Sequence, residues 1–375
     1  MTVEGTCDPR FQRVRDELAA RIKNGEERGA SIAVVERGEL VVDLWGGEGW
    51  TRDTITNVWS ITKTACALAV LVLADRKQID LDLPVAKLWP EFGARGKQDI
   101  TVKQILSHTS GVSGWDAPFS TEDMFDFERA EAKLAAQEPW WEPGVASGYH
   151  LLNYGHLVDA LVRRAAQQSL GDFVRRELAH TDGGAGIDFH VGLADAEFKR
   201  VASLVPPPPN SVDLSKLPSD TPAFKTFSSP RMDIAVTQTP AWRRAGIGAA
   251  GGHGNARSVA LLNSIVTSES KRLSRAMVQR IFEEQADGLD LVLFQPLRFG
   301  IGFGLPCAAV PHLPHLPHGR IAFWGGYGGS VVVNDVDRGI TFAYVMDKMS
   351  GKIIGSTRAT AYTQALYASL GVVTA

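Results

Sequence analysis

A run of small and apolar residues, Ala65 to Ala74, most limits what this chain can fold into. The run is long enough for a buried helix and too short to span a membrane, so it predicts a helix inside a globular domain. Ser60-Ile61-Thr62-Lys63 comes directly before it. Side chains three residues apart share a helix face, with Cβ atoms about 5–6 Å apart. We therefore expect Ser60 at the helix start, beside Lys63.

This serine and lysine have the chemistry of a nucleophile and its base. A serine at a helix start lies near the positive end of the helix dipole, and its N–H is not needed by the helix. Its hydroxyl becomes a nucleophile when a base removes the proton, and Lys63 is the nearest candidate. A second S-x-x-K, Ser268-Glu269-Ser270-Lys271, lies in a polar stretch with no buried helix behind it. We interpret this second motif as a chance match.

The composition excludes several classes of protein. The 375 residues are 44% hydrophobic and 22% charged, which is typical of a globular enzyme with one large domain or two interleaved ones. With a net charge of −3 and no basic stripe, we expect no nucleic-acid partner. Residues 1–7 are neither basic nor apolar, so we expect no signal peptide, and no segment is long enough for a membrane span. The cysteines are few and widely spaced, which favours a reducing, cytoplasmic location: Cys7, Cys66 and Cys307.

Strand patterns fall at both ends of the sequence, and helices in the middle. Near the N-terminus, residues 31–35 and 40–44 flank a turn at Arg37-Gly38 and predict a hairpin. Four apolar segments near the C-terminus also predict strands: Arg298–Phe303, Ile321–Trp324, Ser330–Asn334 and Ile340–Val345. Helices are expected between Asp8 and Gly25 and from Thr357 to Leu370. The pattern indicates an α+β fold, in which an antiparallel sheet built from both ends is flanked by helices and carries a helical insertion.

Two structural parts follow from this pattern. Residues 1–83 and 246–375 would form the sheet domain, with Ser60 and Lys63, and residues 84–245 a mainly helical domain. A cleft between the two parts is the natural place for a site. Pro206 opens a long irregular stretch that runs to about Pro240. We expect this stretch to shape the pocket, the alternative being a flexible surface linker.

A serine nucleophile also needs an oxyanion hole and a proton donor for the leaving group. The Pro-Gly loop 141–148 leads to Tyr149, which would lie with Lys63 around Ser60. An adjacent ammonium would make the tyrosine easier to ionise. The segment Phe323-Trp324-Gly325-Gly326-Tyr327 predicts a strand whose glycines let a substrate approach the backbone. One N–H of that segment, paired with the N–H of Ser60, would form the oxyanion hole.

Together these motifs resemble those of serine esterases with the class C β-lactamase fold, the family VIII carboxylesterases. The resemblance covers nearly the whole chain. It is carried by Ser60-x-x-Lys63, by the loop leading to Tyr149, by Trp324-Gly325-Gly326, and by the segments Leu106–Val112, Gly251–Arg257 and Pro296–Phe303. The resemblance implies a β-lactamase/transpeptidase-like fold. It also implies hydrolysis of small-molecule carboxylic esters through an acyl-enzyme, with no cofactor and no metal.

The same resemblance implies a role for each motif residue. Ser60 is the acylated nucleophile, Lys63 and Tyr149 share the role of base, and Tyr149 returns the proton to the leaving alcohol. The backbone N–H groups of Ser60 and Tyr327 are the oxyanion donors. The pocket around them would be lined by Trp324, Gly325, Gly326 and His150.

Two departures from the β-lactamases of this fold bear on the substrate. Where those enzymes have Tyr-x-Asn, this chain has Tyr149-His150-Leu151, and where they have Lys-Thr-Gly, it has Trp324-Gly325-Gly326. The amide and the lysine that would hold a β-lactam are therefore missing, so we expect neutral, more apolar esters. The alternatives are an acyltransferase with an alcohol acceptor, a weak β-lactamase or D-aminopeptidase, and a catalytically silent scaffold of the same fold.

Two further patterns are discounted. Gly246–Gly251 reads G-x-G-x-x-G, but no buried parallel strand precedes it, so we expect no nucleotide there. His312, His315 and His318 recur every third residue and would share one face of a polyproline helix. No carboxylate or cysteine completes a metal site beside them.

Overall fold

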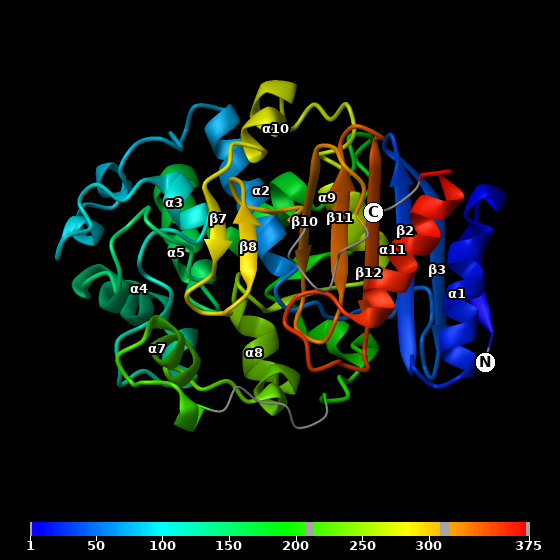
Figure 1. Cartoon of the computed structure of the whole chain (residues 1–375), viewed down its shortest axis with the longest axis horizontal. Helices are drawn as coiled ribbons and strands as arrows, with labels where there is room; N and C mark the ends of the chain where they lie inside the picture. Colours follow the sequence, from blue (N-terminus) through cyan, green and yellow to red (C-terminus); the bar gives the residue numbers. More distant parts are fainter. Residues whose placement is uncertain (1, 208–213, 308–315, 373–375) are drawn as a thin grey trace.

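The computed structural model describes residues 2–207, 214–307 and 316–372 (Figure 1). Its largest element is a nine-stranded antiparallel sheet with the order β1-β3-β2-β12-β11-β10-β9-β8-β7. The strands are β1 Val3–Cys7, β2 Gly29–Glu36, β3 Glu39–Gly47, β7 Ala286–Leu289, β8 Pro296–Phe299, β9 Gly304–Leu305, β10 Ile321–Gly325, β11 Val331–Asp335 and β12 Ile340–Met346. Strands from the two ends of the chain meet where β2 pairs with β12, in the register Ala33↔Ala343. This confirms the predicted α+β sheet built from both ends.

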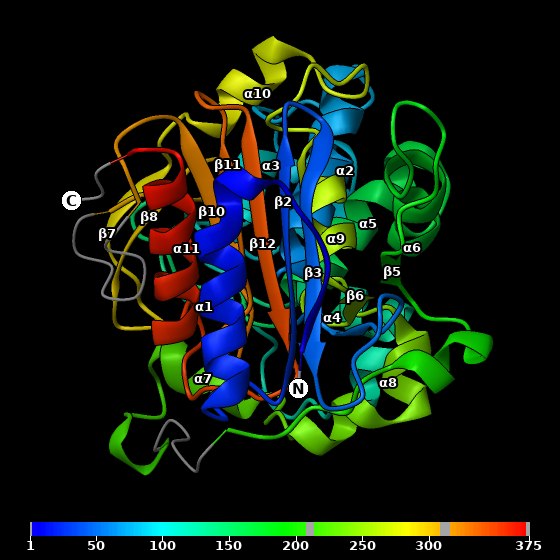
Figure 2. The same cartoon turned by 90° about the vertical axis from the view of Figure 1, so that its right-hand side faces the viewer.

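Helices cover both faces of this sheet (Figure 2). On one face, α1 (Gln12–Lys23) and α11 (Thr357–Ser369) lie side by side. On the other lie α2 (Thr62–Asp75), α5 (Tyr154–Ala166) and α9 (Ala256–Asn263). The N-terminal helix is held by an apolar stripe that is fully or almost fully buried: Phe11, Val14, Leu18 and Ile22.

Short helices dominate the middle of the chain. They are α3 Val102–Leu106, α4 Phe127–Ala136, α6 Leu170–Phe173, α7 Pro222–Ser228 and α8 Pro240–Ala245, with α10 Arg275–Ile281 further along. A small second sheet has the order β4-β6-β5, formed by Thr56–Asn57, Gly252–Gly254 and His190–Val191. It joins the segment before α2 to the segment that follows α8. The division into residues 1–83 with 246–375 and residues 84–245 stays a prediction.

Helix α2 runs through the centre of the fold, as the apolar run predicted. Every residue from Thr62 to Ala74 is buried. A helix that is apolar all round is stable only when it is surrounded by protein. The bend after β8 reaches it through Gly302, where a Cβ atom would lie 2.6 Å from the Ala67 Cβ. The helix therefore has a fixed position, and so do the residues at its start.

The structure differs from the sequence prediction at the edge of the sheet. Residues 298–303 were expected to form one strand, but the chain bends between β8 and β9. At this bend a Cβ atom on Gly300 would lie 1.9 Å from the Ile281 carbonyl oxygen, so the chain passes too close to the end of α10 for any side chain. Strands β1 and β7 were not predicted. His312 and His315 lie outside the described residues, and no described helix has the length and apolar character needed to cross a bilayer.

The burial of α2 leads to a stability prediction. Leu71→Ala should lower the free energy of unfolding by about 2–5 kcal/mol, because the fully buried side chain leaves a cavity in the core. Leu83→Ala is the control, since that side chain is 48% exposed and its truncation should change stability by less than about 0.5 kcal/mol. Urea unfolding monitored by circular dichroism measures both. Equal effects of the two variants would contradict the central position of α2.

Candidate functional site

Ser60 lies in a tight turn directly before α2. Its neighbour Trp59 has φ +51°, a left-handed conformation that a large side chain rarely adopts. The Asn57 side chain holds this turn, since its Oδ1 accepts from the Trp59 N–H at 2.9 Å. The Ser60 carbonyl accepts from the Lys63 N–H at 3.0 Å, so the serine is anchored to the first turn of the helix. The nucleophile candidate is thus held by backbone that the surrounding structure keeps strained.

Lys63 is buried and uses its amino group entirely within the protein. Its Nζ donates to Ser60 Oγ at 3.3 Å, to the Leu151 carbonyl at 2.8 Å and to the Ala249 carbonyl at 2.9 Å. In the described part of the chain, no carboxylate forms an ion pair with it. Burial lowers the pKa of Lys63 to about 7, because the charged form loses its hydration. A large fraction of the amine is therefore neutral near pH 7 and able to accept a proton.

Tyr149 completes a cluster with these two residues. Its ring lies 4.6 Å from Lys63 Nζ, and Trp324 Nε1 donates to its hydroxyl at 3.2 Å. Burial raises the pKa of Tyr149, and hydrogen bonds with Ser60 and Trp324 offset this only in part. The expectation that a neighbouring ammonium favours the phenolate is wrong. Desolvation dominates at this site, and it keeps Tyr149 as a neutral hydroxyl.

The loop that carries Tyr149 is shaped by the segment 106–112. The Gly148 N–H donates to the His108 carbonyl at 2.9 Å, and the His150 N–H to His108 Nδ1 at 3.1 Å. The His150 ring is fully buried, with Nε2 2.6 Å from Ser110 Oγ and Nδ1 2.7 Å from the Gly148 carbonyl. Both ring nitrogens therefore hold the loop in place.

The glycines after β10 let two backbone segments approach each other. A Cβ atom on Gly326 would lie 2.5 Å from the Val58 carbonyl oxygen, so only glycine fits there. This contact brings the following residue, Tyr327, beside the Ser60 turn, where its ring packs on Trp59 at 5.3 Å. Among the described residues, the Tyr327 N–H has no protein acceptor. It is therefore free to serve as a donor to a ligand.

A cavity of about 710 Å³ opens on Ser60 and Tyr327. Its wall is mostly apolar and includes Trp59, Leu151, Leu152, Pro206, Leu214, Phe227, Met232, Ile234, Ala235, Ala250 and Ile353, with Arg231, Asp233 and Gln238 among the polar residues. The described part of the stretch between Pro206 and Pro240 therefore shapes the pocket, as expected from its length. No sequence motif indicated which residues of this stretch would line the pocket.

The four residues predicted to bind substrate do not line this cavity: His150, Trp324, Gly325 and Gly326. In the structure, Trp324 and Gly325 make contacts with other parts of the protein. Trp324 holds the Tyr149 hydroxyl, and a Cβ atom on Gly325 would lie 2.9 Å from the Gly355 N. Their contact with substrate stays a prediction. The sequence did not indicate the carbonyls of Leu151 and Ala249, which accept hydrogen bonds from the Lys63 amine.

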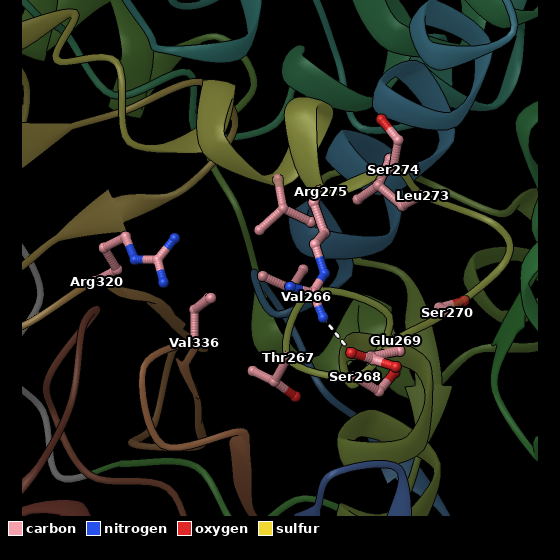
Figure 3. Close-up of a pocket in the computed structure, with 11 residues that line it drawn as sticks. Val266, Thr267, Ser268, Glu269, Ser270, Leu273, Ser274, Arg275, Arg320 and Val336 are labelled. Carbon is pink, nitrogen blue, oxygen red and sulfur yellow. Dashed lines mark hydrogen bonds and ion pairs between the residues drawn. The ribbon is translucent and has the colours of Figure 1, made fainter.

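The second S-x-x-K motif lies elsewhere, in a depression of about 420 Å³ lined by Ser268 and Arg275 (Figure 3). There Ser268 Oγ donates to the Ser264 carbonyl at 2.6 Å. Arg275 is paired with Glu269, and Lys271 is not part of the lining. This geometry provides no base for Ser268 and agrees with a chance match.

Comparison with known proteins gives a consistent result. The family model described as Beta-lactamase matches residues 14–366. Esterase/beta-lactamase LipL of Mycobacterium tuberculosis is 30% identical over 94% of this chain and 84% of that protein. The crystal structure of a family VIII carboxylesterase superposes with a TM-score of 0.90 at 33% identity, covering 98% of this chain and all of the other. EstA from Arthrobacter nitroguajacolicus Rue61a gives a TM-score of 0.87 at 26% identity, over 99% of both chains.

The match extends from the first helix to the last, so every strand of the sheet except β1 falls within it, together with the helices around the Ser60 turn. The resemblance inferred from the sequence motifs is thereby confirmed over the whole fold. This chain belongs to the beta-lactamase family, and within it shares its architecture with the family VIII carboxylesterases.

Proposed function

We propose that this protein hydrolyses small-molecule carboxylic esters through an acyl-enzyme on Ser60. The observation that carries the proposal is the Lys63 amine, which is buried, has no carboxylate partner among the residues that the structure describes, and lies 3.3 Å from Ser60 Oγ. A buried amine of this kind is a base near neutral pH, and a base within reach is what a serine nucleophile requires. The esterase names of the relatives support the same reaction class.

Acylation would begin with attack of Ser60 Oγ on the ester carbonyl carbon, as the hydroxyl proton passes to Lys63 Nζ. The negative charge on the carbonyl oxygen would be stabilised by the N–H groups of Ser60 and Tyr327, which both line the cavity. Collapse of the tetrahedral intermediate breaks the bond to the alcohol oxygen. The proton held by Lys63 then passes to that alcohol oxygen, and the alcohol leaves.

Tyr149 would carry this proton between the amine and the leaving group. Its hydroxyl is neutral, and the Lys63 amine lies over its ring. It can therefore donate its own proton to the departing alkoxide and recover one from the Lys63 ammonium. In deacylation the same groups would act in reverse, taking a proton from water as the water attacks the acyl carbon. Collapse of this second tetrahedral intermediate breaks the bond to Ser60 Oγ, Oγ takes up the proton, and the carboxylic acid leaves.

The cavity supports esters with an apolar portion as substrates. Aliphatic and aromatic side chains form most of its wall, and burying such a substrate against them is favourable. Trp324 occupies the position where β-lactamases of this fold have a lysine, and its indole is directed to Tyr149 rather than to an anion.

The compartment proposed from the cysteines is the cytoplasm. All three thiols are free in the structure, at Cys7, Cys66 and Cys307. Free thiols support a reducing environment.

The acyl-enzyme can be detected directly. Brief exposure to p-nitrophenyl butyrate should add one butyryl group to the wild-type protein, as measured by intact-mass spectrometry. Ser60→Ala should show no adduct and no turnover, while Ser268→Ala, the matched control from the second motif, should behave as wild type. Full activity of Ser60→Ala would disprove the nucleophile. Faster loss of the adduct with added alcohol, with formation of the new ester, would identify an acyltransferase instead.

The activity should depend on pH through Lys63. Its pKa is lowered to about 7, so the amine is neutral above that pH and protonated below it. The value of kcat/KM on an unactivated ester should therefore fall about tenfold per pH unit below about pH 6 and level off above about pH 8. A stopped-assay profile measures this. A flat profile from pH 5 to 9 would rule out Lys63 as the base.

The oxyanion hole can be tested through the glycine before Tyr327. Gly326→Ala should lower kcat by at least about tenfold, because the new methyl group would push the Tyr327 N–H away from Ser60. Gly186→Ala is the control, since no atom lies within 4 Å of its added Cβ. Steady-state kinetics on folded protein, verified by circular dichroism, compares the two. Wild-type kcat in Gly326→Ala would contradict the assignment of Tyr327.

A further inference from the structure

A buried carboxylate, Asp290, accepts a hydrogen bond from the backbone N–H of Tyr149. Asp290 belongs to the connection between β7 and β8 and is fully buried. Its Oδ1 accepts from three backbone N–H groups: Tyr149 at 3.1 Å, Val292 at 3.0 Å and Leu293 at 2.9 Å. The bond to Tyr149 joins residues 141 positions apart in the sequence. The carboxylate thus joins the edge of the sheet to the loop that carries the tyrosine.

Stability alone does not explain this residue. Asp290 Oδ2 makes no hydrogen bond of normal geometry in the described part of the chain, although the Ser147 side chain lies close to the carboxylate, and no cation pairs with it there. Burial raises the pKa of Asp290, which shows that the site disfavours its charge. A buried carboxylate that is only half satisfied is costly, and a buried polar group of this kind calls for an explanation.

The connection between β7 and β8, which carries Asp290, forms a hydrogen-bonded turn. It also makes a second hydrogen bond to the loop before Tyr149. The Asp290 N–H donates to the Gln295 carbonyl at 2.9 Å, and the Phe294 N–H to the Asp290 carbonyl at 3.0 Å. The Leu291 N–H donates to the Ser147 carbonyl at 2.9 Å, two residues before Tyr149. These bonds fix Asp290 relative to the tyrosine backbone.

Tyr149 is consequently held at both ends by one sheet. Asp290, beside the edge strand β7, binds its backbone N–H, and Trp324 of β10 binds its hydroxyl. Because the ring between these two points is fully buried, a shift of the backbone must move the hydroxyl. A displacement of about 1 Å at a reacting group can lower a rate by about two orders of magnitude.

We infer that Asp290 is a positioning residue, which fixes the Tyr149 hydroxyl against Ser60 through the Tyr149 backbone N–H. It does not line the cavity, so it acts without touching substrate. The inference rests on the proposed function for its effect on rate. Its structural part, the placement of Tyr149, stands independently of the reaction.

Three substitutions separate the shape of Asp290 from its charge. Asp290→Asn keeps an oxygen at the position of Oδ1 and should retain kcat within about threefold of wild type. Asp290→Ala removes the acceptor, and Asp290→Glu keeps the charge but displaces it by one methylene. Both should lower kcat by at least about tenfold while KM on p-nitrophenyl butyrate changes by less than about threefold. The glutamate variant also serves if the alanine variant does not fold.

Asp335→Ala is the control, because Asp335 is also a fully buried carboxylate. It accepts from the Arg338 N–H at 3.1 Å and the Tyr367 hydroxyl at 3.2 Å and, unlike Asp290, forms an ion pair with the Arg338 side chain at 2.9 Å. It lies at the end of β11 remote from the Gly326 segment and should leave kcat unchanged in the folded protein. An equal loss of kcat in Asp335→Ala, or a loss in Asp290→Asn as large as in Asp290→Glu, would overturn the inference.

A crystal structure of Asp290→Glu or Asp290→Ala tests the placement without any assay. The expected result is a Tyr149 hydroxyl displaced from its 3.2 Å contact with Trp324 Nε1. An unchanged contact would overturn the inference even if the wild-type enzyme is active. If the wild type forms no acyl adduct and the hydroxyl is nevertheless displaced, the positioning role is supported and the proposed ester hydrolysis fails.

Discussion

The desolvation of one amino group governs the arrangement of this site. Lys63 lies inside the protein with two carbonyls and a hydroxyl as partners. No described residue provides a counterion that would compensate its charged form for the loss of water. The loss of hydration lowers the pKa of Lys63 into the physiological range. The amine can therefore accept a proton near neutral pH, where a lysine at the surface would already be protonated. The apolar helix α2, which is buried from Thr62 to Ala74, maintains this environment by excluding water from it.

The reacting groups come from distant parts of the chain, and unusual backbone brings them together. A left-handed tryptophan precedes the nucleophile, and a glycine that contacts the Val58 carbonyl precedes Tyr327. Each feature is unfavourable or restrictive by itself. Both features lie beside Ser60, which indicates that the fold tolerates local strain in order to fix the geometry of this turn.

The sequence predicted those parts of the fold in which a local residue pattern is compatible with only one kind of secondary structure. An unbroken apolar run identified α2, and short apolar segments near both ends of the sequence identified the sheet. Strand β7 escaped notice because its four residues, Ala286–Leu289, are mostly exposed and include a glycine. The neutral state of Tyr149 could not be predicted, since the degree of burial, which a motif does not record, outweighs the nearby amine. Two of the Lys63 partners, the carbonyls of Leu151 and Ala249, and the three donors to Asp290 Oδ1 are backbone groups, which almost any residue type supplies.

One part of the cavity wall comes from a segment of the chain that carries none of the groups that move protons. Phe227, Met232 and Ile234 line the pocket from the irregular stretch before α8, whereas the serine and lysine are set by α2 and the N–H donor by β10. Side chains on that stretch can consequently change in size or polarity without disturbing the proton path. The architecture separates the choice of substrate from the chemistry performed on it, so one catalytic core can serve a succession of different esters.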